Sequence, residues 1–282
     1  GSLDDDVIFQ WVGIATDSEG VIYLTDTMDY SLKAFSIEGR LIRKQGRKGQ
    51  GPGEFTAPRL LEFSKGLLYV TDQNQQGIQV FDTELSYKRR IPLVFPVVSF
   101  KMIGERLMAV VTLNVDKKGQ LLFIDDKGKV KEKLQYAKEK TPLMMDMADI
   151  EVDKERNVYI AYTFQDKIEK WDRSGKRIWL KSFFRKKKVK TKKIASHVMP
   201  TNIIYKDIAL DSCGRIYVLG GHFAKNSSRD IYVLSPEGEH LATFTLPESS
   251  HCIHIDERDF LYSRANDGVT LKKYKIHYEF ND

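Results

Sequence analysis

Residues 49–82 read GQGPGEFTAPRLLEFSKGLLYVTDQNQQGIQVFD, and this stretch contains the unit from which the chain is built. An apolar segment is followed by a turn with Gly66, a second apolar segment centred on Tyr69, a polar loop, and a third segment that ends near Phe81. Short runs of aliphatic and aromatic residues between Gly, Asp, Asn and Ser are typical of strands joined by tight turns. We therefore expect consecutive antiparallel strands here.

The same unit occurs six times along the 282 residues. The copies read GIATDSEGVIYLTD, LLEFSKGLLYVTD, SFKMIGERLMAVV, DIEVDKERNVYIAY, DIALDSCGRIYVLG and CIHIDERDFLYSRA, with central residues Tyr23, Tyr69, Met108, Tyr159, Tyr217 and Tyr262. A third strand follows each copy, and five copies continue into a fourth. Such units cannot bury both faces alone, whereas a ring packs each sheet between two neighbours. The repeat predicts one all-β domain over residues 1–282, a six-bladed β-propeller with four antiparallel strands per blade.

The last copy ends soon after its third strand, so the ring needs a closing strand from elsewhere. Residues 7–11 are one source, and residues 278–280 are the other. The sequence leaves this choice open.

Composition limits the classes of protein that fit. The longest apolar run, residues 91–100, holds two prolines and is far shorter than the roughly 20 residues of a membrane-spanning helix, so we expect no transmembrane segment. Cys213 and Cys252 form no disulfide framework and are expected to be free thiols. Gly1-Ser2 resembles the scar of a cleaved tag, so the native compartment stays open; export or the cell envelope is favoured. We expect a monomer.

Residues 49–82 closely resemble the NHL repeat, through Gly49, Gly51, Gly53, Phe55, Pro58, Gly66, Tyr69, Asp72, Asn74 and Phe81. The first copy matches from Asp17 onward, and the other copies keep the turn and the central residue. The resemblance implies a six-bladed propeller. It also implies a module that binds protein or RNA, or acts as a sensor, with a few enzymes in the family, so fold alone does not fix function.

The innermost strands bring charged residues to the centre of the ring. Counting back ten and eight residues from each central residue gives two positions on one side of the strand, which include Arg59, Asp149, Glu151, Asp207 and His254. The aligned positions also include Leu61 and Phe100. This set predicts a cluster near the channel mouth that holds a basic ligand or a divalent cation. The alternative is that the carboxylates pair with Arg59 or accept backbone hydrogen bonds.

The loops between second and third strands, with the connections between blades, gather on one face of a propeller, and ligands are expected there. We predict a non-catalytic module that binds a protein, peptide or glycan through this loop-rich face and needs no cofactor. Its candidate residues are Arg59, Asp72, Asn74, Tyr162, Phe164, His222 and Arg264, although Asp72 and Asn74 could instead only shape their loop. The enzymatic alternative is a metal-assisted lyase or lactonase that uses Asp149, Glu151, Asp207 and His254. No Gly-x-Ser-x-Gly elbow occurs in the sequence.

Residues 185–193 hold seven cations, namely Arg185, Lys186, Lys187, Lys188, Lys190, Lys192 and Lys193. The chain has a formal net charge of +6, so the remainder carries −1 and the basicity is local. This connection between the fourth and fifth blades predicts contact with phosphate groups of RNA or with an anionic surface. The alternative is a solvated loop with no specific partner.

Overall fold

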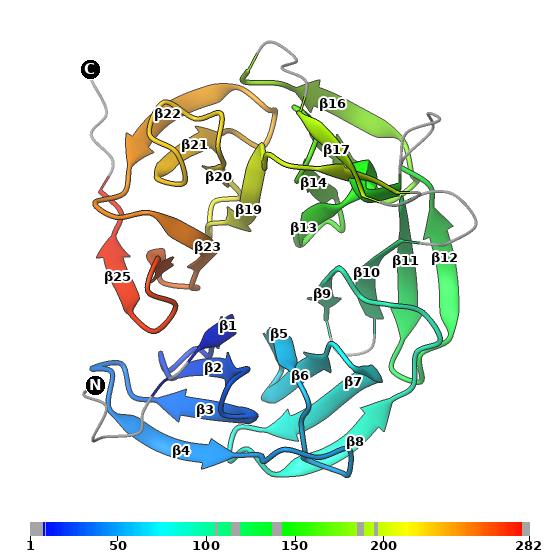
Figure 1. The fold of residues 1–282 in the computed structure, drawn as a ribbon, viewed down its shortest axis with the longest axis vertical. Helices are drawn as coiled ribbons and strands as arrows, with labels where there is room; N and C mark the ends of the chain where they lie inside the picture. Colours follow the sequence, from blue (N-terminus) through cyan, green and yellow to red (C-terminus); the bar gives the residue numbers. More distant parts are fainter. Residues whose placement is uncertain are drawn as a thin grey trace.

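In a computed structural model the chain forms a ring of six antiparallel sheets around a central opening (Figure 1). The structure describes residues 8, 10–104, 107–113, 119–136, 143–184, 189–194 and 197–277. The innermost strands are β1 (Trp11–Thr16), β5 (Pro58–Ser64), β9 (Ser99–Ile103), β13 (Ala148–Val152), β19 (Tyr205–Leu210) and β23 (Ser250–Ile255). The all-β six-bladed propeller predicted from the repeat is confirmed.

Each blade runs outward from its inner strand. The second strands are β2 (Ile22–Asp26), β6 (Leu67–Asp72), β10 (Leu107–Leu113), β14 (Val158–Tyr162), β20 (Ile216–Gly220) and β24 (Phe260–Ala265). The third strands are β3 (Ser31–Phe35), β7 (Gln75–Asp82), β11 (Gly119–Asp125), β15 (Ile168–Trp171), β21 (Asp230–Leu234) and β25 (Leu271–Lys275). The fourth strands are β4 (Leu41–Gln45), β8 (Tyr87–Ile91), β12 (Val130–Leu134), β16 (Arg177–Lys181) and β22 (His240–Thr245).

The six central residues of the repeat all lie on second strands and are at most 1% exposed. Between neighbouring blades they join apolar clusters, such as Tyr217 with Leu219 and Leu261 at the boundary of the fifth and sixth blades. Burying an apolar side chain of this size stabilises the fold by about 1.5–3 kcal/mol. The core is therefore a set of boundaries between blades, which is why single blades are not stable units.

A carboxylate at the first turn of four blades fixes both the turn and the central tyrosine. Asp153 accepts the hydroxyl of Tyr159 at 3.0 Å and the backbone N–H of Asn157 at 2.8 Å. The same pair of bonds occurs at Asp17, Asp211 and Asp256. The Asp that directly follows the first strand of each of these blades is thus a structural residue.

The second and third blades depart from the predicted register. In the second blade Lys65 and Gly66 have φ values of 51° and 75°, the left-handed conformation of a tight two-residue hairpin turn, so Tyr69 pairs with Glu62. In the third blade Ala109, one residue after Met108, pairs with Lys101. Glu62 and Lys101 therefore take the aligned positions in place of Leu61 and Phe100. Leu61 and Phe100 border the channel cavity, but they are 4% and 2% exposed and pack in the clusters between blades.

The described part of the sixth blade has three strands, β23, β24 and β25. Of the two predicted closing segments, residues 7–11 are described only in part: Trp11 pairs with Asp26 in the first blade, and Ile8 packs against the cluster that contains Tyr262 of the sixth. Closure of the sixth blade by this segment stays a prediction. Val7, Phe9 and residues 278–280 lie outside the described residues.

Two further elements lie on the connections between blades. A hairpin of β17 (Thr191–Ile194) and β18 (His197–Pro200) precedes the fifth blade, and a single turn of 3-10 helix, η2 (Leu143–Asp146), precedes the fourth. Within the described residues no helix is long and apolar enough to cross a membrane. Cys213 and Cys252 are free thiols, as predicted.

Candidate functional site

The channel at the centre of the ring contains a cavity of about 160 Å³, lined by all six inner strands. At one level of the channel, the inner strands carry Ala15, Glu62, Lys101, Glu151, Ala209 and His254. Five of these residues pair with the central tyrosine of their blade, and Lys101 pairs with Ala109, the neighbour of Met108. Three of the six are charged and come from consecutive blades. Three neighbouring blades therefore bring charged side chains together at this level.

Lys101 lies between two carboxylates. Its Nζ is 2.8 Å from Glu62 Oε1 and 3.0 Å from Glu151 Oε1, and the three side chains are only 15–23% exposed. Burial opposes the charge on Lys101, but Glu151 and Glu62 outweigh it and raise the pKa of the ammonium group. Burial raises the pKa of Glu62 to about 7, although Lys101 opposes this shift, and it also raises the pKa of Glu151. The group joins the second, third and fourth blades across the channel.

Asp149 and Asp207 lie one level nearer the loop-rich face. Ser99 donates a hydrogen bond to Asp149, and Asp207 accepts the backbone N–H groups of Ile253 and Ile208, each at 2.8 Å. Burial raises the pKa of Asp149 to about 6, and burial together with the charge of Asp149 raises that of Asp207 well above its ordinary value. Neither forms an ion pair with a side chain in the described part of the chain. The charges of Lys101 and Arg59 oppose the rise in the pKa of Asp149, and that of Lys101 opposes the rise for Asp207, so both carboxyl groups lie near a positive charge without pairing with it.

His254 lies in the channel but is bound to a neighbouring blade. Its Nε2 lies 2.9 Å from the hydroxyl oxygen of Thr16, and burial and Lys101 lower its pKa to about 3, so the imidazole is neutral at pH 7. Across the described ranges, no three His, Cys, Asp or Glu side chains are arranged to hold a metal ion. A divalent cation in the channel stays a prediction.

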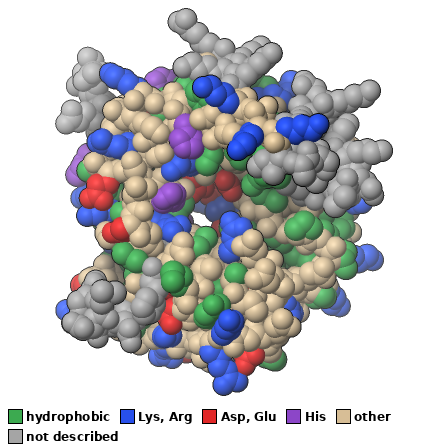
Figure 2. All heavy atoms as spheres, viewed as in Figure 1, with side chains coloured by type: hydrophobic (Ala, Val, Ile, Leu, Met, Phe, Trp, Pro, Cys, Tyr) green, Lys and Arg blue, Asp and Glu red, His purple; other side chains and the backbone are tan. Residues whose placement is uncertain are grey.

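The loop-rich face surrounds the mouth of this channel, and Figure 2 shows acidic side chains within the central hollow. Four of its predicted ligand residues, Arg59, Asn74, Phe164 and His222, are exposed or half-buried. The Nδ1 of His222 accepts the N–H of Ile203 at 2.8 Å, which fixes the ring at the surface. Arg264 is half-buried at the end of β24.

Two predicted ligand residues are buried and serve the loops themselves. Tyr162 is 1% exposed and donates its hydroxyl to Glu169 at 3.0 Å. Asp72 is 6% exposed and accepts the N–H and hydroxyl of Thr56, each at 2.6 Å, and the N–H of Asn74 at 3.0 Å. The structure therefore favours the loop-shaping alternative for Asp72, and it places Tyr162 beneath the surface.

The basic connection is described in part. Lys190, Lys192 and Lys193 are exposed at and beside β17, on the hairpin that contacts η2. Arg185, Lys186, Lys187 and Lys188 lie outside the described residues. Contact with phosphate groups remains a prediction for this hairpin.

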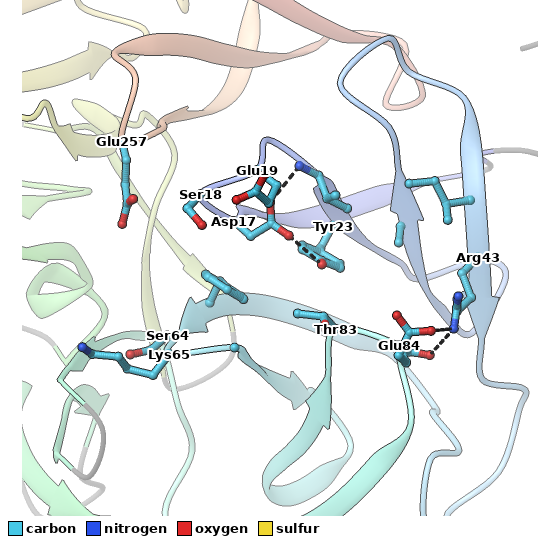
Figure 3. Close-up of a pocket in the computed structure, with 15 residues that line it drawn as sticks. Asp17, Ser18, Glu19, Tyr23, Arg43, Ser64, Lys65, Thr83, Glu84 and Glu257 are labelled. Carbon is cyan, nitrogen blue, oxygen red and sulfur yellow. Dashed lines mark hydrogen bonds and ion pairs between the residues drawn. The ribbon is translucent and has the colours of Figure 1, made fainter.

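A larger pocket opens on the opposite face, between the turns of the first, second and sixth blades (Figure 3). Its volume is about 700 Å³. Tyr23 and Phe63 stack in parallel beside it, with ring centroids 6.1 Å apart and planes 8° apart. Charged side chains at its edge include Glu19, Arg43, Lys65, Glu84 and Glu257. A second groove, of about 550 Å³, lies between β22 and β25 and is mainly apolar.

Sequence reasoning identified Asp149, Glu151, Asp207 and His254 as channel residues but missed Glu62 and Lys101. The second strand of the third copy is apolar on both faces. Residues 107–111 therefore do not show which side chains face the same way as the central tyrosines of the other copies. A better signal was Lys101 itself, a charged residue alternating with Phe100 and Met102 on an inner strand. The pocket of Figure 3 had no sequence signal, because it depends on the size of side chains from different blades.

The ring, its inter-blade cores and its central channel define a six-bladed β-propeller. The chain belongs to the family described as DUF5128, 6-bladed beta-propeller, whose model matches residues 4–219. The architecture implied by the NHL resemblance is thus confirmed, while membership of the NHL family stays a prediction.

Solved propellers of several kinds resemble the structure. Virginiamycin B lyase from Staphylococcus aureus has a TM-score of 0.56 at 13% identity, over 96% of this chain and 85% of the lyase. The WD40 domain of Doa1 has a TM-score of 0.60 at 14% identity, over 93% of this chain and 78% of that domain. The propeller of Cps50 (Swd1) from Myceliophteria thermophila has a TM-score of 0.58 at 11% identity, over 95% of this chain and 98% of that one. At these identities the likeness shows the fold alone. A search of curated protein sequences gave no match.

Proposed function

We propose that this propeller is a non-catalytic binding module that holds a protein or peptide on its loop-rich face, with a basic side chain of the ligand at the channel mouth. The observation that supports this most strongly is the pair Asp149 and Asp207. Both carboxyl groups are held in place by hydrogen bonds, and the pKa of each is raised by burial. A cation placed between them would stabilise both ionised forms.

The rest of the channel supports binding rather than chemistry. Lys101 is occupied by Glu62 and Glu151, and His254 is held by Thr16. A lysine with a raised pKa is a poor nucleophile, because its amine is protonated at neutral pH. Glu62, Lys101 and Glu151 therefore hold one another. Asp149 and Asp207 lie near Lys101 but form no ion pair with it, so both are available to a cationic ligand group.

Titration with N-acetyl-arginine amide tests this proposal, with the uncharged N-acetyl-citrulline amide as the matched control ligand. We expect NMR shift changes at the channel mouth with the arginine compound only, and their loss in the Asp149→Asn/Asp207→Asn double variant. Glu155→Gln, at an exposed turn, is the control variant. Equal binding of the two compounds, or full binding by the double variant, would contradict the proposal.

Selection of peptides from a random display library extends the test to the whole face. We expect selected peptides to carry Arg or Lys and to lose binding to the double variant. The metal-assisted lyase and RNA-binding alternatives make other demands. The first needs a divalent ion bound by Asp149, Glu151, Asp207 and His254. The second needs RNA affinity that weakens with salt and when Lys190, Lys192 and Lys193 become alanine.

A further inference from the structure

The pocket of Figure 3 lies where the first blade carries a small side chain, Ala34. At the level of the central tyrosine, the first blade carries Tyr23, Ala34 and Arg43 on adjacent strands. The fourth blade carries Tyr159, Lys170 and Trp179 at the same level. There Lys170 Nζ and Trp179 Nε1 both donate to the carbonyl of Pro236 in the next blade, each at 3.1 Å, and so fill the space. The methyl group of Ala34 leaves the corresponding space open.

The middle of this pocket is apolar. Val21, Ala34, Ile42 and the ring of Phe63 line it, and Ile42 is 51% exposed although it is a large hydrophobic residue. The ring of Phe63 is half-buried and is held in orientation by stacking on Tyr23, whose hydroxyl in turn donates to Asp17 at 3.0 Å. The pocket therefore has a fixed aromatic ring in its wall, the kind of surface on which the C–H face of a flat, rigid ligand packs.

Each end of the pocket has charges of both signs. Figure 3 shows Arg43 and its ion-pair partner Glu84 on one side of Tyr23, and Lys65 and Glu257 on the other. Glu19 and the hydroxyl groups of Ser18 and Thr83 lie along the edge between the two ends. A charged ligand group would meet a like charge at either end. A neutral ligand with hydroxyl groups would donate to the carboxylates and accept from Arg43 and Lys65.

We propose that this pocket is a second binding site, on the face opposite the channel mouth, for a neutral saccharide of about two rings. The volume is within the range of about 300–1,000 Å³ that is usual for small-molecule sites. One sugar ring packs on Phe63 and Ile42, and its hydroxyl groups reach Glu19 and Arg43. The site shares no residue with the channel.

Saturation-transfer difference NMR with maltose, cellobiose, lactose and N,N′-diacetylchitobiose tests the proposal. At least one of these neutral disaccharides should bind. Phe63→Leu removes the flat ring but keeps an apolar side chain, and we expect it to raise the Kd about three- to tenfold. Glu19→Gln/Glu257→Gln changes two exposed residues and should weaken binding without affecting folding.

Phe244→Leu is the matched control, because Phe244 contacts the central Tyr217 in the other groove. It should leave the affinity unchanged. Absence of binding by all four disaccharides would overturn the proposal. So would unchanged binding by Phe63→Leu, or tighter binding of the cationic, deacetylated chitobiose than of its neutral form. The channel is tested separately by the arginine compound, so failure of one site leaves the other result intact.

Discussion

The position of an individual residue in this propeller was predictable where the residues around it showed which face of the strand it occupies. Asp149 and Asp207 were placed in the channel because Tyr159 and Tyr217 mark the register of their blades without ambiguity. Glu62 was missed because the two-residue turn at Lys65 and Gly66 shortens the hairpin by one residue. A shift of one residue exchanges the two faces of a strand, so a small error in a turn moves a charged residue out of the predicted site.

The raised pKa of Asp149 predicts a specific pH dependence of stability. Its pKa rises from 3.8 to about 6 on folding, so the folded state binds the proton more tightly. The resulting stabilisation is present below about pH 4 and is lost as the pH rises through 6. Asp149→Asn lacks this dependence. We expect the stability of the wild type relative to this variant to fall by about 2 kcal/mol between pH 4.5 and 7.5.

Urea unfolding of both proteins at the two pH values measures this difference. Glu155→Gln is the control variant. It shows how much of the pH dependence of the free energy of unfolding comes from an exposed carboxylate outside the channel. A constant difference between wild type and Asp149→Asn across the pH range would contradict the assignment of Asp149 to a buried position.

Strands and turns were predicted better than the loops between them. The third strand of each blade begins and ends close to its expected residues because an apolar run marks it, and in four blades an Asp-x-x-Gly or Ser-x-x-Gly turn follows it in the sequence. The hairpin of β17 and β18 was not predicted, because its lysine-rich strand lacks an apolar face. An exposed strand of this kind is indistinguishable by pattern from a solvated loop.

The carboxylate at the first turn predicts a repeated contribution to stability. Tyr159→Phe, Tyr217→Phe and Tyr262→Phe each remove one hydroxyl that donates to an aspartate. Each change should lower the free energy of unfolding by about 1 kcal/mol. Tyr87→Phe, which leaves the contact of Tyr87 with Phe81 in place, is the control. Chemical denaturation of the four variants would show whether the three turns are equivalent; a cost as small as the control's in all three would remove this role.

At the scale of the whole molecule, the ring of blades was predictable from the sequence. The residues that meet in its central channel were predictable only in part. Periodicity fixed the number of blades, since six similar units fill the chain. The contacts across the channel could not be read from any one unit, because Glu62, Lys101 and Glu151 belong to three different blades. The same holds for the pocket beside Ala34, which depends on three blades.

Lys101 should therefore matter to the ring as a whole. Lys101→Met leaves two carboxylates facing each other in the channel, and we expect a loss of about 2–3 kcal/mol in the free energy of unfolding, below the cost for a fully buried pair because the groups are partly exposed. Glu62→Gln/Lys101→Met/Glu151→Gln should recover part of this loss. Lys127→Met, at an exposed turn, is the control. If the single and triple variants unfold at the same urea concentration as the wild type, the network does not hold the blades together.

The residue at position 34 bears on how the binding sites of a propeller evolve. The room in the pocket of Figure 3 depends on the side chains at the positions of Ala34 and Arg43, while the strands around it pair as in the other blades. The fourth blade shows that Lys and Trp at the matching level seal the gap. A propeller can thus gain or lose a small-molecule site by substitutions at a few positions between two blades. Recognition sites on its six seams are free to diversify one at a time, without refolding the ring.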